Sequence, residues 1–110
     1  MTKDYETLKS FYIAGVQFHE LKNILNDIEV DQTLELVLEP SNRFDPNAVR
    51  IEHFKFDEGE YTMCGYVPKK FSAEISALIS IGTPLECVIT EVNRNAKPWE
   101  QCKVEIREVK

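Results

Sequence analysis

Apolar and polar positions alternate in the middle of the chain and again near its end, which is the pattern of strands that bury one face. This alternation predicts strands over residues 33–39, 47–54, 85–90 and 102–107. A segment rich in β-branched and aromatic residues predicts a first strand over 11–16, and another strand over 61–67 follows a polar turn at 57–60. The first ten residues are polar, so we expect a flexible lead-in over 1–10 and a single domain over 11–110.

Two further segments repeat apolar residues every three or four positions, the period of a helix with one buried face. The first runs from Leu21 to Ile28, and the second from about Lys69 to Ser80. Pro68 suits the start of the second helix, and Gly82 suits its end. Six short strands and two covering helices predict a mainly β domain, built as a strongly curled sheet or small barrel.

The apolar faces of these elements define an expected core. Its members are Leu34, Leu36, Leu38, Val49, Ile51, Phe71, Ile75, Leu78, Ile89, Val104 and Ile106. Three cysteines, Cys64, Cys87 and Cys102, lie in the same kind of apolar, strand-like context, and none forms a Cys-x-x-Cys pair. We therefore interpret them as reduced core residues.

Composition narrows the class of protein. The 110 residues carry a net charge of −6, the opposite of the basic surface expected of a general nucleic-acid binder. Hydrophobic content of 43% is ordinary for a globular domain. No apolar run approaches the roughly 20 residues of a membrane span, and the amino terminus lacks a signal peptide's apolar region, so we expect a cytoplasmic protein without a membrane partner.

Catalytic chemistry finds little support in the sequence. The two histidines, His19 and His53, stand far apart without the spacing of metal ligands, and the four glycines form no phosphate-binding loop. We predict a non-enzymatic protein that needs no metal and no cofactor.

The segment that joins the strands at 33–39 and 47–54 is the strongest candidate for function. Pro40 and Pro46 exclude regular strand pairing there, and the segment carries Arg43 beside the aromatic Phe44. One interpretation is a rigid turn with Phe44 packed onto the end of the barrel. Asp45 is similarly open to two interpretations: a brace for the backbone, or a general base or metal ligand.

Three separated motifs resemble the HIRAN domain family. They are Ala14-Gly15-Val16-Gln17-Phe18, then Glu39-Pro40-x-Asn42-x-Phe44-Asp45-x-Asn47-Ala48-Val49, then Gly65-Tyr66-Val67-Pro68. The resemblance covers about residues 11 to 107, and as a domain without further segments the chain resembles the stand-alone bacterial and phage members. It implies an OB-like curled sheet or barrel with two helices.

The resemblance also implies a function, because eukaryotic members hold the 3′ end of single-stranded DNA by aromatic stacking and bind its hydroxyl through an aspartate. The corresponding nucleic-acid-binding positions here are Phe18, Asn42, Phe44, Asp45, Tyr66 and Lys69, to which we add the neighbouring Arg43 and Lys70. The family's usual tyrosines at positions 18 and 44 are phenylalanines here, which keep a stacking face but lose the phenol hydroxyl.

Two functions of different class follow from the sequence. The first is a non-enzymatic module that binds single-stranded nucleic-acid ends, with 3′-OH ends of DNA as the expected partner and a DNA-processing protein as a further one. The alternative is an acidic protein-interaction or regulatory module that keeps the barrel without binding DNA.

Overall fold

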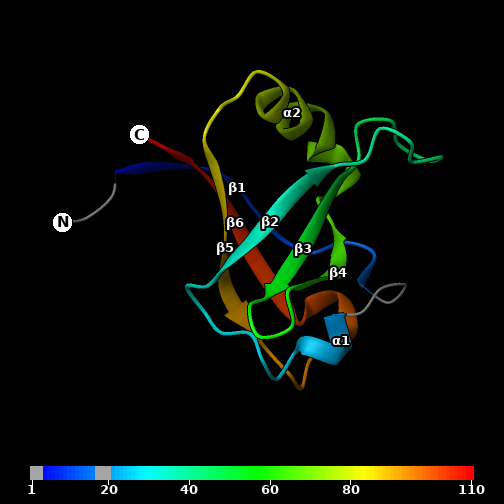
Figure 1. The fold of residues 1–110 in the computed structure, drawn as a ribbon, viewed down its shortest axis with the longest axis vertical. Helices are drawn as coiled ribbons and strands as arrows, with labels where there is room; N and C mark the ends of the chain where they lie inside the picture. The colour runs from blue at the N-terminus through cyan, green and yellow to red at the C-terminus, as the bar shows by residue number, and fades with distance from the viewer. Residues whose placement is uncertain (1–3, 17–20) are drawn as a thin grey trace.

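The strands form one antiparallel sheet in the order β1-β6-β5-β2-β3-β4 (Figure 1). The computed structural model describes residues 4–16 and 21–110. The strands are β1 (Tyr5–Tyr12), β2 (Thr33–Leu38), β3 (Val49–Lys55), β4 (Glu60–Tyr66), β5 (Leu85–Val92) and β6 (Cys102–Val109). The fold class predicted from the alternation is confirmed.

The sheet curls because β2 changes partner along its length. Thr33 and Leu34 pair with β5, whereas the rest of β2 pairs with β3. Among the described strands, no ladder joins β4 back to β1. A single bridge brings their ends together, since the amide of Ala14 donates to the Tyr66 carbonyl at 2.9 Å and the amide of Tyr66 returns a bond of 2.8 Å. The sheet is therefore strongly curled but not a closed barrel.

Two helices lie at opposite ends of the curled sheet, α1 (Leu21–Ile24) and α2 (Lys69–Ser80) (Figure 1). A short 3-10 helix, η2 (Pro98–Glu100), precedes β6. The predicted bounds of α2 are confirmed, but the helix expected over Leu21–Ile28 ends at Ile24, because the amide of Asp27 bonds the Ile24 carbonyl three residues back and makes a turn. None of the helices in the described ranges is long and apolar enough to cross a membrane.

The first strand begins at Tyr5, six residues earlier than predicted. Tyr5 pairs with Val109, and the Lys110 amide donates to the Asp4 carbonyl at 2.9 Å. The expected lead-in over residues 1–10 is therefore wrong for residues 5–10, while residues 1–3 lie outside the described ranges. Most of this edge strand is exposed, so its sequence lacks the apolar alternation that marks the inner strands.

The expected core is assembled largely as predicted. Val49, Ile51, Ile75, Ile89, Val104 and Ile106 have no exposed surface, and Leu34 is also buried. Leu36, Leu38, Phe71 and Leu78 are only partly buried and pack against this cluster from its edge. The cluster is extended by further buried residues, among them Phe11, Ile13, Leu21 and Ile28.

All three cysteines are free and buried, as expected. Burial raises the pKa of Cys64 and of Cys102 to about 12, and it raises the pKa of Cys87 as well. Because only the thiolate reacts, we predict that a thiol reagent labels none of them rapidly in the folded protein and all three in denaturant. Fast labelling of the native protein in a timed reaction would contradict their burial.

Gly65 is required where the chain after β1 crosses β4. A Cβ atom at this position would lie 2.4 Å from the Ala14 carbonyl oxygen and 2.6 Å from the Ile13 side chain. Because the nearest atom belongs to backbone, Gly65→Ala is expected to cost about 1–3 kcal/mol of stability.

Amide hydrogen exchange identifies the origin of this loss. The amides of Ala14 and Tyr66 should exchange faster in Gly65→Ala, because the added methyl separates the two segments that they join. Gly59→Ala is the control, since a Cβ at Gly59 meets nothing within 4 Å and its strain comes from a positive φ of 65°. Equal protection of the two amides in both variants would refute the close-approach argument.

Candidate nucleic-acid interface

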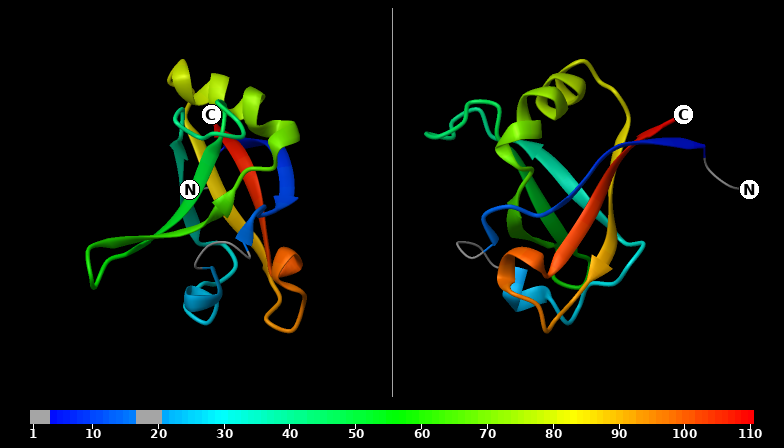
Figure 2. Two further views of the ribbon diagram at one scale, coloured as in Figure 1. Left: turned by 90° about the vertical axis from the view of Figure 1, so that its right-hand side faces the viewer. Right: turned by 180° about the vertical axis from the view of Figure 1, so that it is seen from behind.

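The loop over residues 39–48 is held in shape by the side chain of Asn42. Its Oδ1 accepts hydrogen bonds from the backbone amides of Phe44 at 2.9 Å and of Asp45 at 3.0 Å. These bonds replace the ladder that the prolines exclude, so the loop has a defined backbone conformation. All three views of the fold place the loop beside α2 (Figures 1 and 2).

A polar network ties this loop to the end of β4. The Tyr66 hydroxyl donates to Glu39 Oε1 at 2.8 Å, and Asn42 Nδ2 donates to the same oxygen at 2.9 Å. Arg50 lies 3.5 Å from the other carboxylate oxygen. Burial alone would raise the pKa of Glu39, but these hydrogen bonds and the Arg50 charge lower it. Burial is the main cause that raises the pKa of Tyr66, and the hydrogen bond that its hydroxyl donates to Glu39 is the second.

Asp45 connects the loop to the first turn of α2. The Ser72 hydroxyl donates to Asp45 Oδ2 at 2.6 Å, and the Asn47 amide donates to Oδ1 at 2.9 Å. The bond from Ser72 lowers the pKa of Asp45, so the carboxylate is ionised at neutral pH. Asp45 is thus a brace for the backbone. Each carboxylate oxygen still has a second lone pair, so the group can accept a further hydrogen bond.

A small pocket of about 260 Å³ lies between this loop, the end of β4 and the start of α2. We call it the end pocket, and its lining residues are Ala14, Gly15, Asn42, Phe44, Asp45, Ala48, Tyr66, Val67 and Lys69. Its volume is just below the roughly 300–1,000 Å³ of sites for drug-sized ligands, so it fits a small group such as one end of a longer molecule.

Phe44 is largely exposed at the edge of this pocket. Its side chain is 85% exposed, so the interpretation that Phe44 packs onto the end of the barrel is wrong. Because this ring borders a pocket on a loop held by side-chain hydrogen bonds, it is available for contact with a ligand.

Five of the eight predicted site residues line the end pocket together, namely Asn42, Phe44, Asp45, Tyr66 and Lys69. Arg43 is exposed on the same loop but does not line the pocket. Lys70 points its ammonium group over the ring of Phe71, 5.1 Å from the ring centre. Phe18 lies outside the described residues, so the structure says nothing of its place.

Several residues of the site were not predicted from the sequence. Ala14, Gly15 and Ala48 were part of the quoted motifs, and their small side chains leave the space that the pocket occupies. Glu39 was also in a motif, and its acidic side chain could have indicated that it accepts hydrogen bonds in the site. Nothing in the sequence indicated a role for Ser72, because that role depends on a contact with Asp45, 27 positions away in the chain.

Two solved structures are similar to this chain in fold. A crystal structure of a protein from Lactobacillus plantarum is similar with a TM-score of 0.77 and 14% identity, covering 99% of each chain. The HIRAN domain of human HLTF is similar with a TM-score of 0.59 and 12% identity, over 96% of this chain and 77% of that one. At such low identities, the structural similarity shows a shared fold alone. No curated protein matches the chain.

The family assignment follows from the sequence profile. The family model of the HIRAN domain matches residues 8–108, which is nearly the whole chain. This match includes the three motifs, each of which contributes residues to the lining of the end pocket. The protein belongs to the HIRAN domain family.

Proposed function

We propose that this protein is a non-enzymatic module that binds the 3′ end of single-stranded DNA in the end pocket. The observation that carries the proposal is the exposed ring of Phe44 beside a small pocket that also contains the Asp45 carboxylate and Lys69. Membership of the HIRAN family supports it, because the resemblance of the motifs implies this function for the matching residues.

Stacking supplies the main attraction. One face of an aromatic side chain contributes about 1–3 kcal/mol per stacked base, whatever the base. The hydrogen bonds from the Phe44 and Asp45 amides to Asn42 hold the loop before DNA arrives, so little conformational entropy is lost on binding. Phe44 is therefore a preorganised platform for a base near the strand end.

Asp45 supplies the preference for an end. An ionised carboxylate accepts a hydrogen bond from a sugar hydroxyl but repels a phosphate group. An internal nucleotide presents phosphates on both sides of its sugar, whereas a 3′ terminus presents a free hydroxyl. The site therefore favours a terminal sugar over an internal one.

The positive charge near the pocket is small. Lys69 lines it, and Arg43 and Lys70 are exposed nearby on the loop and on α2. At about 0.7 per phosphate contact on single strands, two or three contacts give a salt slope of magnitude about 1.4–2. Binding should therefore be modest and only weakly salt-dependent.

The test is a titration of a 5′-labelled single strand of about ten nucleotides, within the usual site sizes of single-strand binders. We expect the strand ending in 3′-OH to bind about tenfold more tightly than the same strand ending in 3′-phosphate. A hydrogen bond to a charged group contributes about 1.5–3 kcal/mol, and tenfold is the low end of that range. Fluorescence anisotropy at low salt measures both affinities.

The alternative function is favoured by one observation, the net charge of −6. An acidic protein-interaction module would bind neither oligonucleotide. If neither strand binds at about 500 µM protein, which corresponds to about 4–5 kcal/mol, the end-binding proposal fails and the interaction module replaces it.

A further inference from the structure

The sheet opens between β2 and β3 at the end away from the end pocket. The ladder between these strands ends at the pair of Glu35 and Glu52. Beyond it, Thr33 and Leu34 pair with β5, and among the described strands residues 53–55 of β3 pair with β4 alone. One edge of β3 therefore faces an opening where the sheet could accept another extended chain.

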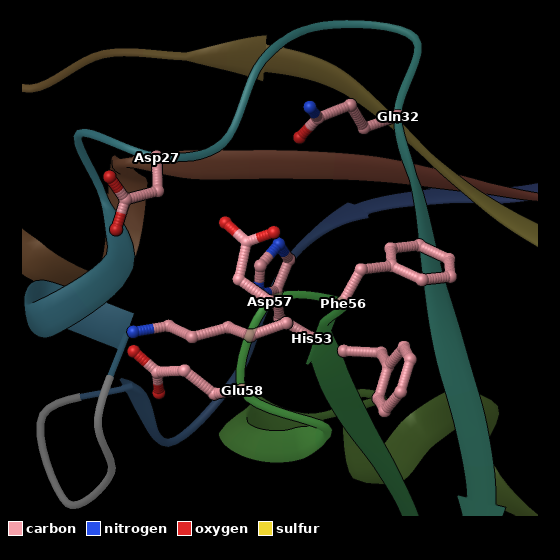
Figure 3. Close-up of a pocket in the computed structure, with 8 residues that line it drawn as sticks. Asp27, Gln32, His53, Phe56, Asp57 and Glu58 are labelled. Atoms are coloured by element: carbon pink, nitrogen blue, oxygen red, sulfur yellow. The ribbon is translucent and has the colours of Figure 1, made fainter.

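Two adjoining cavities of about 470 and 410 Å³ occupy this opening, and both are lined by Gln32, His53, Phe54 and Phe56. We call them together the acidic groove. Figure 3 shows that Asp27 and Gln32 reach the larger cavity from the segment between α1 and β2, whereas His53, Phe56, Asp57 and Glu58 reach it from β3 and the turn after it. The groove thus lies between two separate chain segments.

Aromatic rings gather on one side of this groove. The Phe54 ring lies 5.0 Å from the Phe56 ring and 4.8 Å from the Tyr61 ring, measured between centroids. Phe56 is 87% exposed and Tyr61 is 57% exposed. These residues belong to the β3–β4 hairpin, which projects from the body of the domain (Figure 2, left). An exposed aromatic cluster on a projecting hairpin is typical of an interaction surface.

The charges that line the groove are almost all negative. Its carboxylates are Asp27, Asp31, Glu35, Asp57 and Glu58, and its one lysine is Lys55. This distribution repels a phosphate backbone and attracts lysine and arginine side chains.

We propose that the acidic groove binds an extended, basic segment of a partner protein. The exposed edge of β3 offers main-chain hydrogen bonds, the rings of Phe54 and Phe56 bind apolar side chains, and the five carboxylates bind arginine or lysine. A metal ion is a poorer occupant, because no group of three or more His, Cys, Asp or Glu in the described ranges is arranged to hold one.

The groove and the end pocket lie at opposite ends of one hairpin. β3 runs from Val49, beside the end pocket, to Lys55 at the groove. At about 3.3 Å per residue, the six steps from Val49 to Lys55 span roughly 20 Å, so the two sites can be occupied together. The groove would then place a basic partner protein at a fixed distance from whatever the end pocket holds.

The test uses a fluorescein-labelled peptide of about ten residues in which arginine and leucine alternate, an extended pattern that presents one kind of side chain to each face. The same peptide with glutamate in place of arginine is its control. We expect anisotropy to show binding of the basic peptide only. Phe56→Ser, and separately Asp57→Asn with Glu58→Gln, should each weaken it at least about fivefold, a loss of about 1 kcal/mol that most residues of an interface do not reach.

All of these groups are exposed, so the variants are expected to fold normally, which circular dichroism checks. Phe44→Ala should bind the peptide as the wild type does, which separates this proposal from DNA binding at the end pocket. The proposal would be overturned by no binding of the basic peptide, by binding that Phe56→Ser leaves unchanged, or by displacement of the peptide by single-stranded DNA. A dimer in sedimentation equilibrium that Phe56→Ser dissociates would also overturn it, in favour of a second copy as the occupant.

Discussion

Replacing Ile75 by alanine is expected to lower the free energy of unfolding by about 2–5 kcal/mol. Ile75 has no exposed surface and belongs to the central cluster that joins α2 to the sheet. Truncation removes three carbons from a closely packed site and leaves a cavity that the fixed sheet cannot fill. Urea denaturation measures the loss, with an unchanged m value showing that the unfolded state is not altered.

Leu36→Ala provides the comparison for this variant. Leu36 was predicted in the same core, but it is only partly buried at the edge of the cluster, so its loss should be smaller, under about 2 kcal/mol. A larger loss for Leu36→Ala than for Ile75→Ala would mean that α2 does not cover the sheet as described. Because α2 also carries Lys69 and Ser72, its anchoring at Ile75 supports the end pocket directly.

Replacing Phe44 by alanine is expected to weaken single-stranded DNA binding by about 5–150-fold, which corresponds to the 1–3 kcal/mol of one stacked base. The ring is 85% exposed in the free protein, so its removal should change the stability by less than about 0.5 kcal/mol. The two strand ends should lose affinity about equally, because stacking does not depend on the terminal group. Anisotropy titration measures the affinities, and thermal denaturation confirms the stability.

Phe56→Ala is a matched control for this prediction. Phe56 is 87% exposed, nearly the same as Phe44, but it lies in the acidic groove at the other end of the hairpin. DNA affinity should change less than about twofold in this variant, within the usual spread of surface substitutions. Equal losses in Phe44→Ala and Phe56→Ala would show that exposed rings bind DNA without a defined site.

Sequence periodicity predicted the parts of the fold in which one face is buried. The inner strands β2, β3, β5 and β6 carry alternating apolar residues because each has a core side, and α2 carries the stripe that Ile75 anchors. The start of β1 was not predicted from periodicity, because Tyr5–Ser10 lie on a mostly exposed edge strand that needs no apolar alternation. Periodicity also did not predict that the helix ends at Ile24, because the apolar residues of the following turn are buried whether or not the helix continues.

The site was predictable where the chemistry is local. Asn42 and Asp45 bond backbone amides two or three residues away, which turn-forming residues between prolines already indicated. The contact between Asp45 and Ser72, and the bridge of Ala14 with Tyr66, join segments far apart in the chain. Such contacts depend on how the sheet curls, and periodicity carries no information about that curl. The exposure of Phe44 likewise required the packed structure.

The most direct test of the proposed function compares the two strand ends on Asp45→Asn. Asparagine keeps the shape of the side chain. Its oxygen can still accept a hydrogen bond from the Asn47 amide and its NH2 group can donate to the Ser72 hydroxyl, so the loop should stay folded while the negative charge is lost. The wild type should prefer the 3′-OH strand to the 3′-phosphate strand about tenfold, and Asp45→Asn should reduce that preference to within about twofold. Asp4→Asn, an exposed position on the chain before β1, should keep the full preference. A preference that survives in Asp45→Asn, or a wild type that binds both ends equally, would contradict recognition of the 3′ hydroxyl by Asp45.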